Sequence, residues 1–487
     1  MSVVEFLQDL SFKGVKLRTD GEKLRVGGYQ SILTSDVIAQ LKQHKTEILN
    51  VLHDSPDILN TYPLSYGQQA MWFLWQLAPE SGFYNVVFSC RICSQVDVTT
   101  LQKTFQKLME RHPQLRSSFP QQGNKPVQKI HQTQLLNFEQ INTSACSEQE
   151  LHQRVFQESQ QPFNLENGQV MRVRLFTSSE EEHILLLTVH HIAIDAWCLP
   201  LVIEEMILTY AALESGEQPS LTPLKDSYID YVRWQRDLLT SNQGEKLWHY
   251  WQKKLAGDLP VLNLPTDRQR PPIQTYNGAS HRFTLSPKLT AQLKQLAQRE
   301  GATQYMVLLA AFQVLLYRYT GQEDILVGVP TSGRTKSEFM PLVGYFVDPV
   351  VMRANLAGDS SFREFLVQIR SCVSEALANQ DFPFALLVER LQSKRDPSRS
   401  PIFQVFFNFI LQNLRQFEHS QQLLLGGEVD LEGLKLKSYE MSQMEGQFDL
   451  DLMMAEANSE LVGFFRYNTD LFDRETIARM VGHFENL

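Results

Sequence analysis

The sequence has few cysteines and too little positive charge for several classes of protein. Five cysteines are spread unevenly over 487 residues, which disfavours a disulfide framework and fits a reducing cytosol. Lysine and arginine total 45 against 55 aspartates and glutamates, and the net charge of −10 disfavours nucleic acid as a partner. The longest strongly apolar stretch, residues 306–317, is shorter than the about 20 residues that span a membrane. We therefore expect a cytoplasmic protein with neither a nucleic-acid nor a membrane partner.

Several motifs of known chemistry are also missing. There is no GxSxG elbow for a serine hydrolase and no glycine-rich loop for a nucleotide phosphate. Cys90 and Cys93 have CxxC spacing, but no second pair or nearby histidine completes a zinc site. The N-terminus carries Glu5 and Asp9 and lacks the basic start of a secretory signal. A metal, redox or secreted protein is therefore disfavoured.

Composition and length indicate a multidomain globular protein. Hydrophobic residues make up 43% and charged residues 21%, so the chain can bury a large core. At roughly 150 residues per domain, the length favours about three folding units. We expect a small module over residues 1–53, a linker over 54–61 and a large domain over 62–487. The proline-rich stretch 264–272 is a natural crossover between two lobes, which we place at about 62–225 and about 226–487.

The first residues predict a helix, a hairpin and a second helix. Apolar residues at helical spacing cover residues 3–10 and 35–52, and alternating residues flank Asp20-Gly21, a hairpin signal. The hairpin has a basic outward face made of Lys16, Arg18, Lys23 and Arg25. This face is either simply solvated or marks a strand edge that adds a peptide strand from an acidic partner tail.

Helices and strands alternate along the large domain. This order favours a layered α/β sandwich rather than an all-helical or all-strand fold. Capping and periodicity predict helices near residues 101–109, 287–300 and 303–319, and strands over 183–189 and 325–329.

The most informative segment is an apolar strand that ends in two histidines, His190 and His191, with Asp195 four residues beyond the second. Side chains alternate along a strand, so His191 and Asp195 share one face and His190 takes the other. Histidine moves protons near neutral pH, whereas a buried Asp195 would position its neighbours through a cationic or hydrogen-bonding partner. The alternative is that both histidines are structural. The sequence gives less support to a metal site, because neighbouring side chains on a strand point to opposite faces.

The segment His190-His-Ile-Ala-Ile-Asp-Ala-Trp197 resembles the HHxxxDxW signature of condensation domains of nonribosomal peptide synthetases. Six further motifs resemble those of the family in order and spacing. They are Leu64-Ser-Tyr-Gly-Gln-Gln-Ala-Met-Trp72, Arg111-His-Pro-Gln-Leu-Arg-Ser-Ser-Phe119, Tyr228-Ile-Asp-Tyr-Val-Arg-Trp-Gln235, Val343-Gly-Tyr-Phe-Val-Asp-Pro349, Asn379-Gln-Asp-Phe-Pro-Phe384 and Arg395-Asp-Pro-Ser-Arg-Ser-Pro401.

The resemblance implies two lobes similar to chloramphenicol acetyltransferase, meeting in a V around a tunnel with His191 midway along it. Donor and acceptor would arrive as thioesters on phosphopantetheine arms of two carrier proteins. The acceptor amine would then attack the donor thioester to form an amide, an acyltransferase reaction. No metal or bound cofactor is implied.

Several residues receive roles from this resemblance. His191, with His190 and Asp195, is the expected catalytic group, acting either as a general base or by orienting the amine. Asp195 is expected to pair with an arginine, first Arg334 in Thr331-Ser-Gly-Arg334 and second Arg353. We expect Trp197, Ser332 and Gly333 to support the site.

The sequence departs from the family pattern at three positions. Ala196 stands where glycine is usual, and Ala70 and Asp348 replace what are commonly arginine and asparagine. These changes leave His191 in place but bear on the substrate subtype. Ser65-Tyr-Gly-Gln and Phe83-Tyr-Asn85 are similar to domains whose donor is a polyketide or other acyl chain.

The first fifty residues resemble TubC-like docking domains, which capture the C-terminal tail of the preceding synthetase subunit. An adenylation domain beyond the present C-terminus is a further expected partner. Heterocyclising and epimerising relatives, a free-standing acyltransferase and a non-catalytic recruitment domain are the alternatives. The histidine pair argues against a heterocyclising domain. The N-terminal module argues against an epimerising domain and a free-standing acyltransferase, and the intact motif argues against a non-catalytic recruitment domain.

Overall fold

The computed structural model describes residues 3–20, 23–28, 32–54, 60–358, 360–391, 396–410, 417–424, 426–431, 434–439, 441, 446–457 and 460–487. The chain forms two compact units. Unit 1 comprises Met1–Leu238, Lys336–Phe346 and Gly427–Tyr439, and unit 2 comprises Leu239–Thr335, Val347–Gly426 and Glu440–Leu487. These units differ from the two lobes expected from the sequence, because two late segments return to unit 1.

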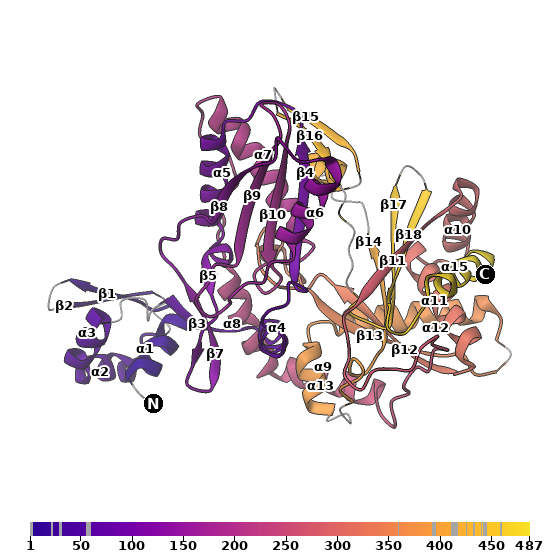
Figure 1. The fold of residues 1–487 in the computed structure, drawn as a ribbon. Helices are drawn as coiled ribbons and strands as arrows, with labels where there is room; N and C mark the ends of the chain where they lie inside the picture. Colours follow the sequence, from indigo (N-terminus) through magenta and orange to yellow (C-terminus); the bar gives the residue numbers. More distant parts are fainter. Residues whose placement is uncertain are drawn as a thin grey trace. The chain divides into compact units, whose positions relative to one another are not determined.

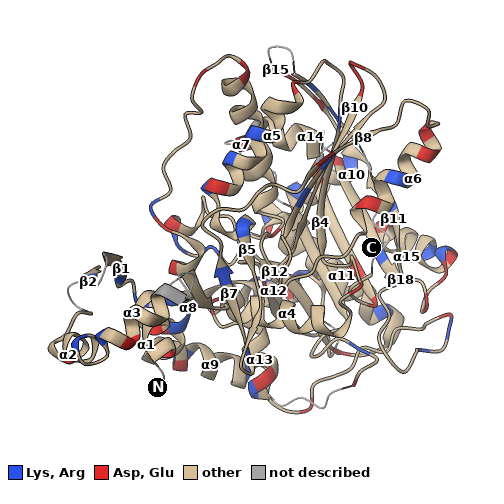
Figure 2. Ribbon diagram, turned by 60° about the vertical axis from the view of Figure 1, so that its left-hand side comes forward, with Lys and Arg blue, Asp and Glu red and all other residues tan. Residues whose placement is uncertain are grey.

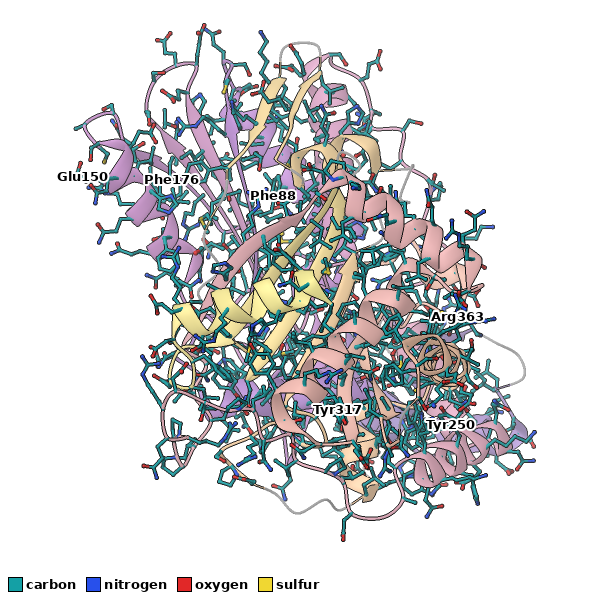
Figure 3. All side chains as sticks on the ribbon, turned by 90° about the vertical axis from the view of Figure 1, so that its right-hand side faces the viewer. Phe88, Glu150, Phe176, Tyr250, Tyr317 and Arg363 are labelled. Carbon is teal, nitrogen blue, oxygen red and sulfur yellow. The ribbon has the colours of Figure 1, made fainter. Side chains whose placement is uncertain are left out.

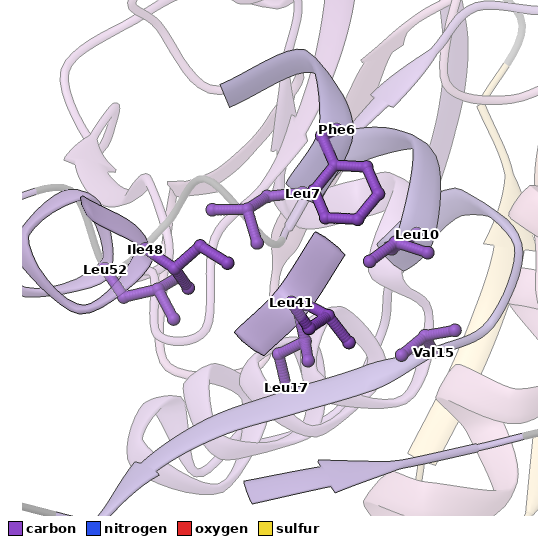
Figure 4. Close-up of a cluster of buried hydrophobic side chains, with 8 residues drawn as sticks. All are labelled: Phe6, Leu7, Leu10, Val15, Leu17, Leu41, Ile48 and Leu52. Carbon is purple, nitrogen blue, oxygen red and sulfur yellow. The ribbon is translucent and has the colours of Figure 1, made fainter. Parts of the chain in front are cut away.

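The N-terminal module, residues 3–54, has its own small core (Figure 4). Its helices and hairpin strands are α1 (Val3–Phe12), β1 (Lys16–Asp20), β2 (Lys23–Gly27), α2 (Ser35–Gln43) and α3 (Lys45–Asp54). Eight buried apolar side chains face one another; they come from α1, β1, α2, α3 and Val15, the residue before β1. The predicted first helix and the hairpin after it are confirmed. Gly21 of the hairpin turn and linker residues 55–59 lie outside the described residues.

The second helix of this module was predicted as one element over residues 35–52, and that prediction is wrong. Two helices, α2 and α3, meet at His44, whose φ of −96° and ψ of 13° leave the helical range. The Thr34 hydroxyl caps α2 by accepting a hydrogen bond from the Val37 amide. The break folds α3 back toward the core, where Ile48 is fully buried.

A six-stranded sheet forms the main part of unit 1 (Figure 1). Strand β10, residues 183–190, lies between β4 and β9, and all eight of its residues are buried. Phe88 of β4 and Phe176 of β9, labelled in Figure 3, are also buried. In spatial order the strands are β15 (Glu428–Leu431), β16 (Leu434–Ser438), β4 (Asn85–Ile92), β10 (His183–His190), β9 (Met171–Thr177) and β8 (Phe138–Asn142).

Strands β15 and β16 come from late in the chain, yet β16 pairs antiparallel with β4. A second, smaller sheet holds β3 (Thr61–Pro63), β5 (Ser117–Ser118), β6 (Gln121–Gln122) and β7 (Lys125–Ile130). The helices of this unit beyond the N-terminal module are α4 (Tyr66–Leu77), α5 (Val98–Arg111), α6 (Glu148–Ser159), α7 (Cys198–Glu214) and α8 (Tyr228–Leu239).

Unit 2 is built on a mixed six-stranded sheet, in which β14 runs parallel to β12 and β17. In spatial order its strands are β11 (Gly278–Leu285), β18 (Glu460–Asn468), β17 (Leu450–Ala457), β14 (Val405–Ile410), β12 (Asp324–Thr331) and β13 (Asp348–Asn355). Its helices are α9 (Asn242–Lys254), α10 (Pro287–Arg299), α11 (Gln304–Thr320), α12 (Phe362–Ala378), α13 (Phe384–Leu391), α14 (Glu418–Leu424) and α15 (Arg474–Asn486).

Local capping explains where the helices of unit 2 begin. Ser286 accepts a hydrogen bond from the Leu289 amide, with Pro287 in the first turn of α10. The Thr303 side chain caps α11 by accepting a hydrogen bond from the Met306 amide, and Gly321 ends that helix in the left-handed conformation. The helices predicted here from the sequence, and the strand over 325–329, are confirmed.

Acidic and basic residues are interspersed along the helices (Figure 2). None of the helices in the described ranges has the length and apolarity that a membrane crossing requires.

Candidate active site

His191 follows the last residue of β10 and is fixed by hydrogen bonds on two sides. Its backbone N–H donates to the carbonyl of Tyr84 at 2.8 Å, and its ring Nδ1 lies 2.7 Å from the carbonyl oxygen of Ile194. A carbonyl oxygen only accepts, so Nδ1 carries the proton and the neutral ring leaves Nε2 with a free lone pair. This tautomer suits a group that accepts a proton.

Burial lowers the pKa of His191, although the nearby Asp195 carboxylate and the bond to Ile194 act in the opposite direction. The lowered pKa keeps the ring neutral at pH 7. The Tyr345 ring packs edge-on against the imidazole, with ring centroids 5.1 Å apart. The site therefore combines a neutral acceptor with an aromatic wall.

His190 has a different environment. Its ring is buried, with Phe163 edge-on at 6.2 Å between centroids. The Ile192 amide donates to its Nδ1 at 3.1 Å, so this nitrogen is unprotonated. Burial, followed by the proximity of His191, lowers the pKa of His190 to about 3. Its contacts are those of a residue that shapes the turn after β10.

Asp195 is fully buried and joins two segments that are far apart in sequence. Its Oδ1 accepts a hydrogen bond from the Cys198 amide, which begins α7, and its Oδ2 accepts one from the Phe346 amide, both at 3.0 Å. The carboxylate therefore fixes the segment that carries Tyr345 next to His191. Its pairing with Arg334 stays a prediction.

Residues 342–346 form the second half of the site, and their contacts were not predicted from the sequence. The hydroxyl of Tyr228, from α8, donates to the Tyr345 carbonyl at 2.6 Å and lies 2.9 Å from the Ser65 hydroxyl. The Cys198 sulfur lies 3.4 Å from both the amide nitrogen and the carbonyl oxygen of Gly344. A Cβ at Gly344 would lie 2.1 Å from the Tyr228 ring, so only glycine fits.

The opening motif supports the turn that carries the histidines. Gln68 is buried, and its side-chain Nε2 donates to the Ile192 carbonyl at 3.2 Å. A Cβ at Gly67 would lie 2.7 Å from the Tyr345 ring, so this glycine allows the ring to approach α4. Matching the motif located these residues without revealing that they contact the segments around His191 and Tyr345.

The second motif anchors α7, the helix that follows Asp195. Arg111 donates from Nε to Glu205 at 3.0 Å, and His112 Nε2 lies 2.6 Å from the other oxygen of the same carboxylate. Glu205 lies on α7 and is buried. These bonds connect α5 to the helix whose first turn meets the Asp195 carboxylate.

The remaining residues predicted for the site occupy separate positions. Trp197 is half-buried before α7, and no described residue hydrogen-bonds its Nε1. In unit 2, buried Arg334 donates from Nη1 to the Ser332 carbonyl at 3.2 Å, and Gly333 has a left-handed φ of 63°. Arg353, the second candidate for Asp195, instead pairs with Asp324 at 2.7 Å, because β12 and β13 place them on adjacent strands.

Asp348 begins β13 in unit 2. Burial raises its pKa to about 8, while a hydrogen bond from the Phe384 amide, 2.9 Å long, favours the ionised form. An aspartate at the position where the sequence motif commonly has asparagine therefore titrates near neutral pH.

The CxxC pair and the hairpin lysines were also singled out from the sequence. Burial and the neighbouring Cys93 raise the pKa of Cys90 to about 12, whereas Cys93 is exposed. The described ranges contain no group of three His, Cys, Asp or Glu residues that could hold a metal ion. Lys16, Lys23 and Arg25 are exposed on the hairpin, while the side chain of Arg18 lies outside the described residues.

Comparison with protein families matches both parts of the chain. Residues 58–487 match the family described as Condensation domain, and residues 3–54 match the TubC N-terminal docking domain. A linear gramicidin synthase of Brevibacillus parabrevis is 39% identical over 431 residues, which cover 87% of this chain and 5% of that protein. Bacitracin synthase 2 of Bacillus licheniformis is 32% identical over 499 residues, which cover 100% of this chain and 18% of that protein. The chain thus spans a small part of these relatives.

Solved structures share the fold. A four-domain nonribosomal peptide synthetase, holo-AB3403 bound to AMP and glycine, has a TM-score of 0.80 at 24% identity, covering 87% of this chain and 32% of that one. An X-domain from teicoplanin biosynthesis has a TM-score of 0.79 at 25% identity, and the match covers 87% of this chain and 93% of the X-domain chain. The X-domain has also been solved in complex with OxyB, with a TM-score of 0.77, 25% identity and coverage of 87% and 91%. The expected mixed α/β fold is confirmed.

Proposed function

Because the chain belongs to the condensation-domain family, with a TubC-type docking domain at its N-terminus, we propose that it forms an amide bond between two carrier-bound substrates. The donor is an acyl or peptidyl thioester, and the acceptor is the free amine of an aminoacyl thioester. The amine nitrogen bonds to the donor carbonyl carbon, the C–S bond breaks, and the donor carrier's thiol leaves. The enzyme is thus an acyltransferase.

The tautomer of His191 is the observation that carries this proposal. The bond from Nδ1 to the Ile194 carbonyl leaves Nε2 free to accept a proton from the attacking amine. The same nitrogen then returns the proton to the departing thiolate, so the ring ends as it began. The pKa of His191 is lowered by burial, which keeps this acceptor unprotonated at neutral pH.

Positioning supplies a second contribution. An α-amine has a reference pKa of about 7.7 to 8.0, so a useful fraction is already neutral at pH 7. Holding two thioesters in contact removes the entropy cost of their encounter. The hydrogen bonds from Cys198 and Phe346 to Asp195 support this role, because they fix the segments on both sides of the imidazole.

The proposed partners follow from the two parts of the chain. The substrates come on phosphopantetheine arms of donor and acceptor carriers, and the protein itself holds no cofactor in this proposal. The N-terminal module receives the tail of an upstream subunit, which raises the effective concentration of its carrier. An adenylation domain is a proposed downstream partner. The cytoplasm is the proposed compartment, since no disulfide joins any of the five cysteines.

Intact-mass analysis of the acceptor carrier tests the reaction. An aminoacyl-loaded acceptor carrier is incubated with a panel of acyl-loaded donor carriers and the wild-type protein, His191→Ala or the exposed-site control His249→Ala. We expect the acceptor to gain the mass of the donor acyl group with the wild type and the control. We expect His191→Ala to be slower by about 100-fold or more.

The other outcomes separate the alternatives. An equal gain with His191→Ala would overturn proton transfer by His191 while leaving the condensation reaction in place. No gain with any donor, in protein with normal melting, would overturn condensation and favour a recruitment domain. The fold of the X-domain solved with OxyB supports this second candidate, whereas the intact His191 and Asp195 favour catalysis.

A further inference from the structure

A large cleft separates the hairpin of the N-terminal module from the start of α8, and both lie in unit 1. Its volume is about 1170 Å³. Lys16, Leu17 and Thr19 of β1 line one side, and Lys225, Asp226 and Arg233 line the other. Pockets for small molecules usually hold roughly 300–1,000 Å³, so the cleft suits a segment of peptide better than a single metabolite.

The register of the hairpin shows which backbone groups face away from β2. Two residues separate Asp20 from Lys23, and the pair that closes such a turn is hydrogen-bonded. Hydrogen-bonded and non-bonded pairs alternate along an antiparallel ladder, so Thr19 and Leu17 occupy non-bonded pairs with Leu24 and Val26. The N–H and C=O groups of Thr19 and Leu17 therefore point away from β2, on the strand that lines the cleft.

The wall opposite β1 is held in place by the end of α1. Phe12 is buried with Tyr228, Tyr231 and Phe346 in one cluster. The Arg233 guanidinium donates to the Phe12 and Ser11 carbonyls and pairs with Asp230 at 2.5 Å. These contacts hold the end of α1 against α8 and so set the distance between the hairpin and α8. The cleft is therefore maintained by packing and hydrogen bonds.

The charges in the cleft favour an acidic occupant. Arg233 and Asp230 neutralise each other through their ion pair. Lys16 and Lys225 then remain against the single carboxylate of Asp226, and neither lysine has a side-chain hydrogen bond or ion pair within the described ranges. A strand edge with unpaired backbone groups and a surplus of positive charge suits an extended peptide with acidic side chains.

We propose that the upstream tail binds in this cleft as a strand added to the open edge of β1, covered on its other side by the condensation domain. This inference rests on the docking role proposed above, and it makes the binding site composite. Lys225, which lies outside the N-terminal module, then contacts the tail as directly as Lys16 does.

Charge reversals in the full chain test the composite site. The probe is a fluorescein-labelled peptide in which valine alternates with glutamate, with a lysine-for-glutamate peptide as the charge control, and binding is followed by fluorescence anisotropy. We expect Lys16→Glu and Lys225→Glu each to weaken binding about tenfold. Lys42→Glu, an exposed lysine on α2 outside the cleft lining, should leave the affinity unchanged.

Two proline substitutions test which edge receives the strand. Thr19→Pro removes an outward N–H on β1, and Val26→Pro removes one on the outer edge of β2. The proposal expects Thr19→Pro to abolish binding and Val26→Pro to preserve it, with melting and circular dichroism unchanged in both. The reverse pattern would overturn the assignment to β1.

The outcomes distinguish this inference from the docking role itself. If Lys16→Glu weakens binding and Lys225→Glu does not, the tail contacts the hairpin alone, and the composite site is overturned while docking stands. If the acidic peptide does not bind the wild-type chain, or the lysine peptide binds equally well, capture of an acidic tail is itself overturned.

Discussion

Strand β10 and the β1–β2 hairpin are both β structures of unit 1, but their edges differ. Strand β10 is paired by β4 on one side and β9 on the other, and its eight residues are buried. Within the described residues, β1 pairs with β2 alone and β2 with β1 alone. A strand bonded on both sides holds His191 still, whereas an open edge can gain a strand. The proposed chemistry and the proposed binding of the tail thus lie on different kinds of sheet.

The largest loss of stability should come from removing the Asp195 carboxylate, which fixes the segments around His191. Asp195→Ala removes the acceptor of two hydrogen bonds, from Cys198 and Phe346, and such bonds contribute roughly 1.5–3 kcal/mol each. We expect the melting temperature to fall by about 5 °C or more. The matched control is Asp258→Ala, an exposed position, which should melt like the wild type. Normal melting of Asp195→Ala would contradict its positioning role.

Gly344→Ala should displace the segment next to His191 without removing a charged group. The added Cβ meets the Tyr228 ring and displaces the segment that carries Tyr345 next to His191. We expect the condensation rate in the intact-mass assay to fall about tenfold or more. Gly482→Ala, in open space on α15, is the control and should keep full activity. Full activity in Gly344→Ala would mean that residues 342–346 do not position the site.

Phe12→Ala tests the join between the two regions. Phe12 packs with Tyr228 and Phe346, whereas Phe6 belongs to the separate core of the N-terminal module. Hydrogen exchange should rise severalfold at the start of α8 in Phe12→Ala, while α2 and α3 stay protected. The paired variant Phe6→Ala should instead expose α2 and α3. Unchanged exchange at α8 in Phe12→Ala would show that the aromatic cluster does not depend on the module.

The smallest expected effect extends the comparison to the sheet of unit 2. Burial raises the pKa of Asp348 to about 8, above its value in the unfolded chain, so folding favours the protonated form. Stability is therefore lost as the pH rises from about 4 toward 8, and Asp348→Asn removes that loss. We expect the gain to grow by up to about 1.4 kcal/mol per pH unit between pH 4 and pH 8, so that it is larger at pH 8 than at pH 5 when measured by thermal melting. The control is Asp258→Asn, a substitution of the same kind at an exposed position.

Elements with strong local signals could be predicted from the sequence. Helix α10 begins after Ser286 and ends just before Gly301 because capping and glycine act within one turn. The apolar run 183–189 gave β10 for the same reason. The break at His44 was missed, since apolar spacing continues through it and the tertiary core of the module decides where α2 stops.

The candidate site was only half predictable. His191 and Asp195 belong to one short motif, whereas Tyr345 reaches His191 through a bond from Tyr228 that joins positions 117 residues apart. Periodicity carries no information on such pairs. The ion pair of Arg353 was missed for a related reason, because Asp324 reaches it from the adjacent strand β12 and not from a neighbouring position in the sequence.

The late hairpin β15–β16 has a consequence for how the protein is made and cut. Strand β4 leaves the ribosome long before residues 434–438, which complete its ladder through β16. During synthesis β4 therefore keeps an uncovered edge until most of unit 2 has been translated. A recombinant fragment that stops at Leu238 would retain this edge permanently, and we expect it to aggregate. A domain exchange should therefore keep the N-terminal module and residues 60–487 together, because β16 completes the sheet of unit 1 and Phe12 packs against Tyr228.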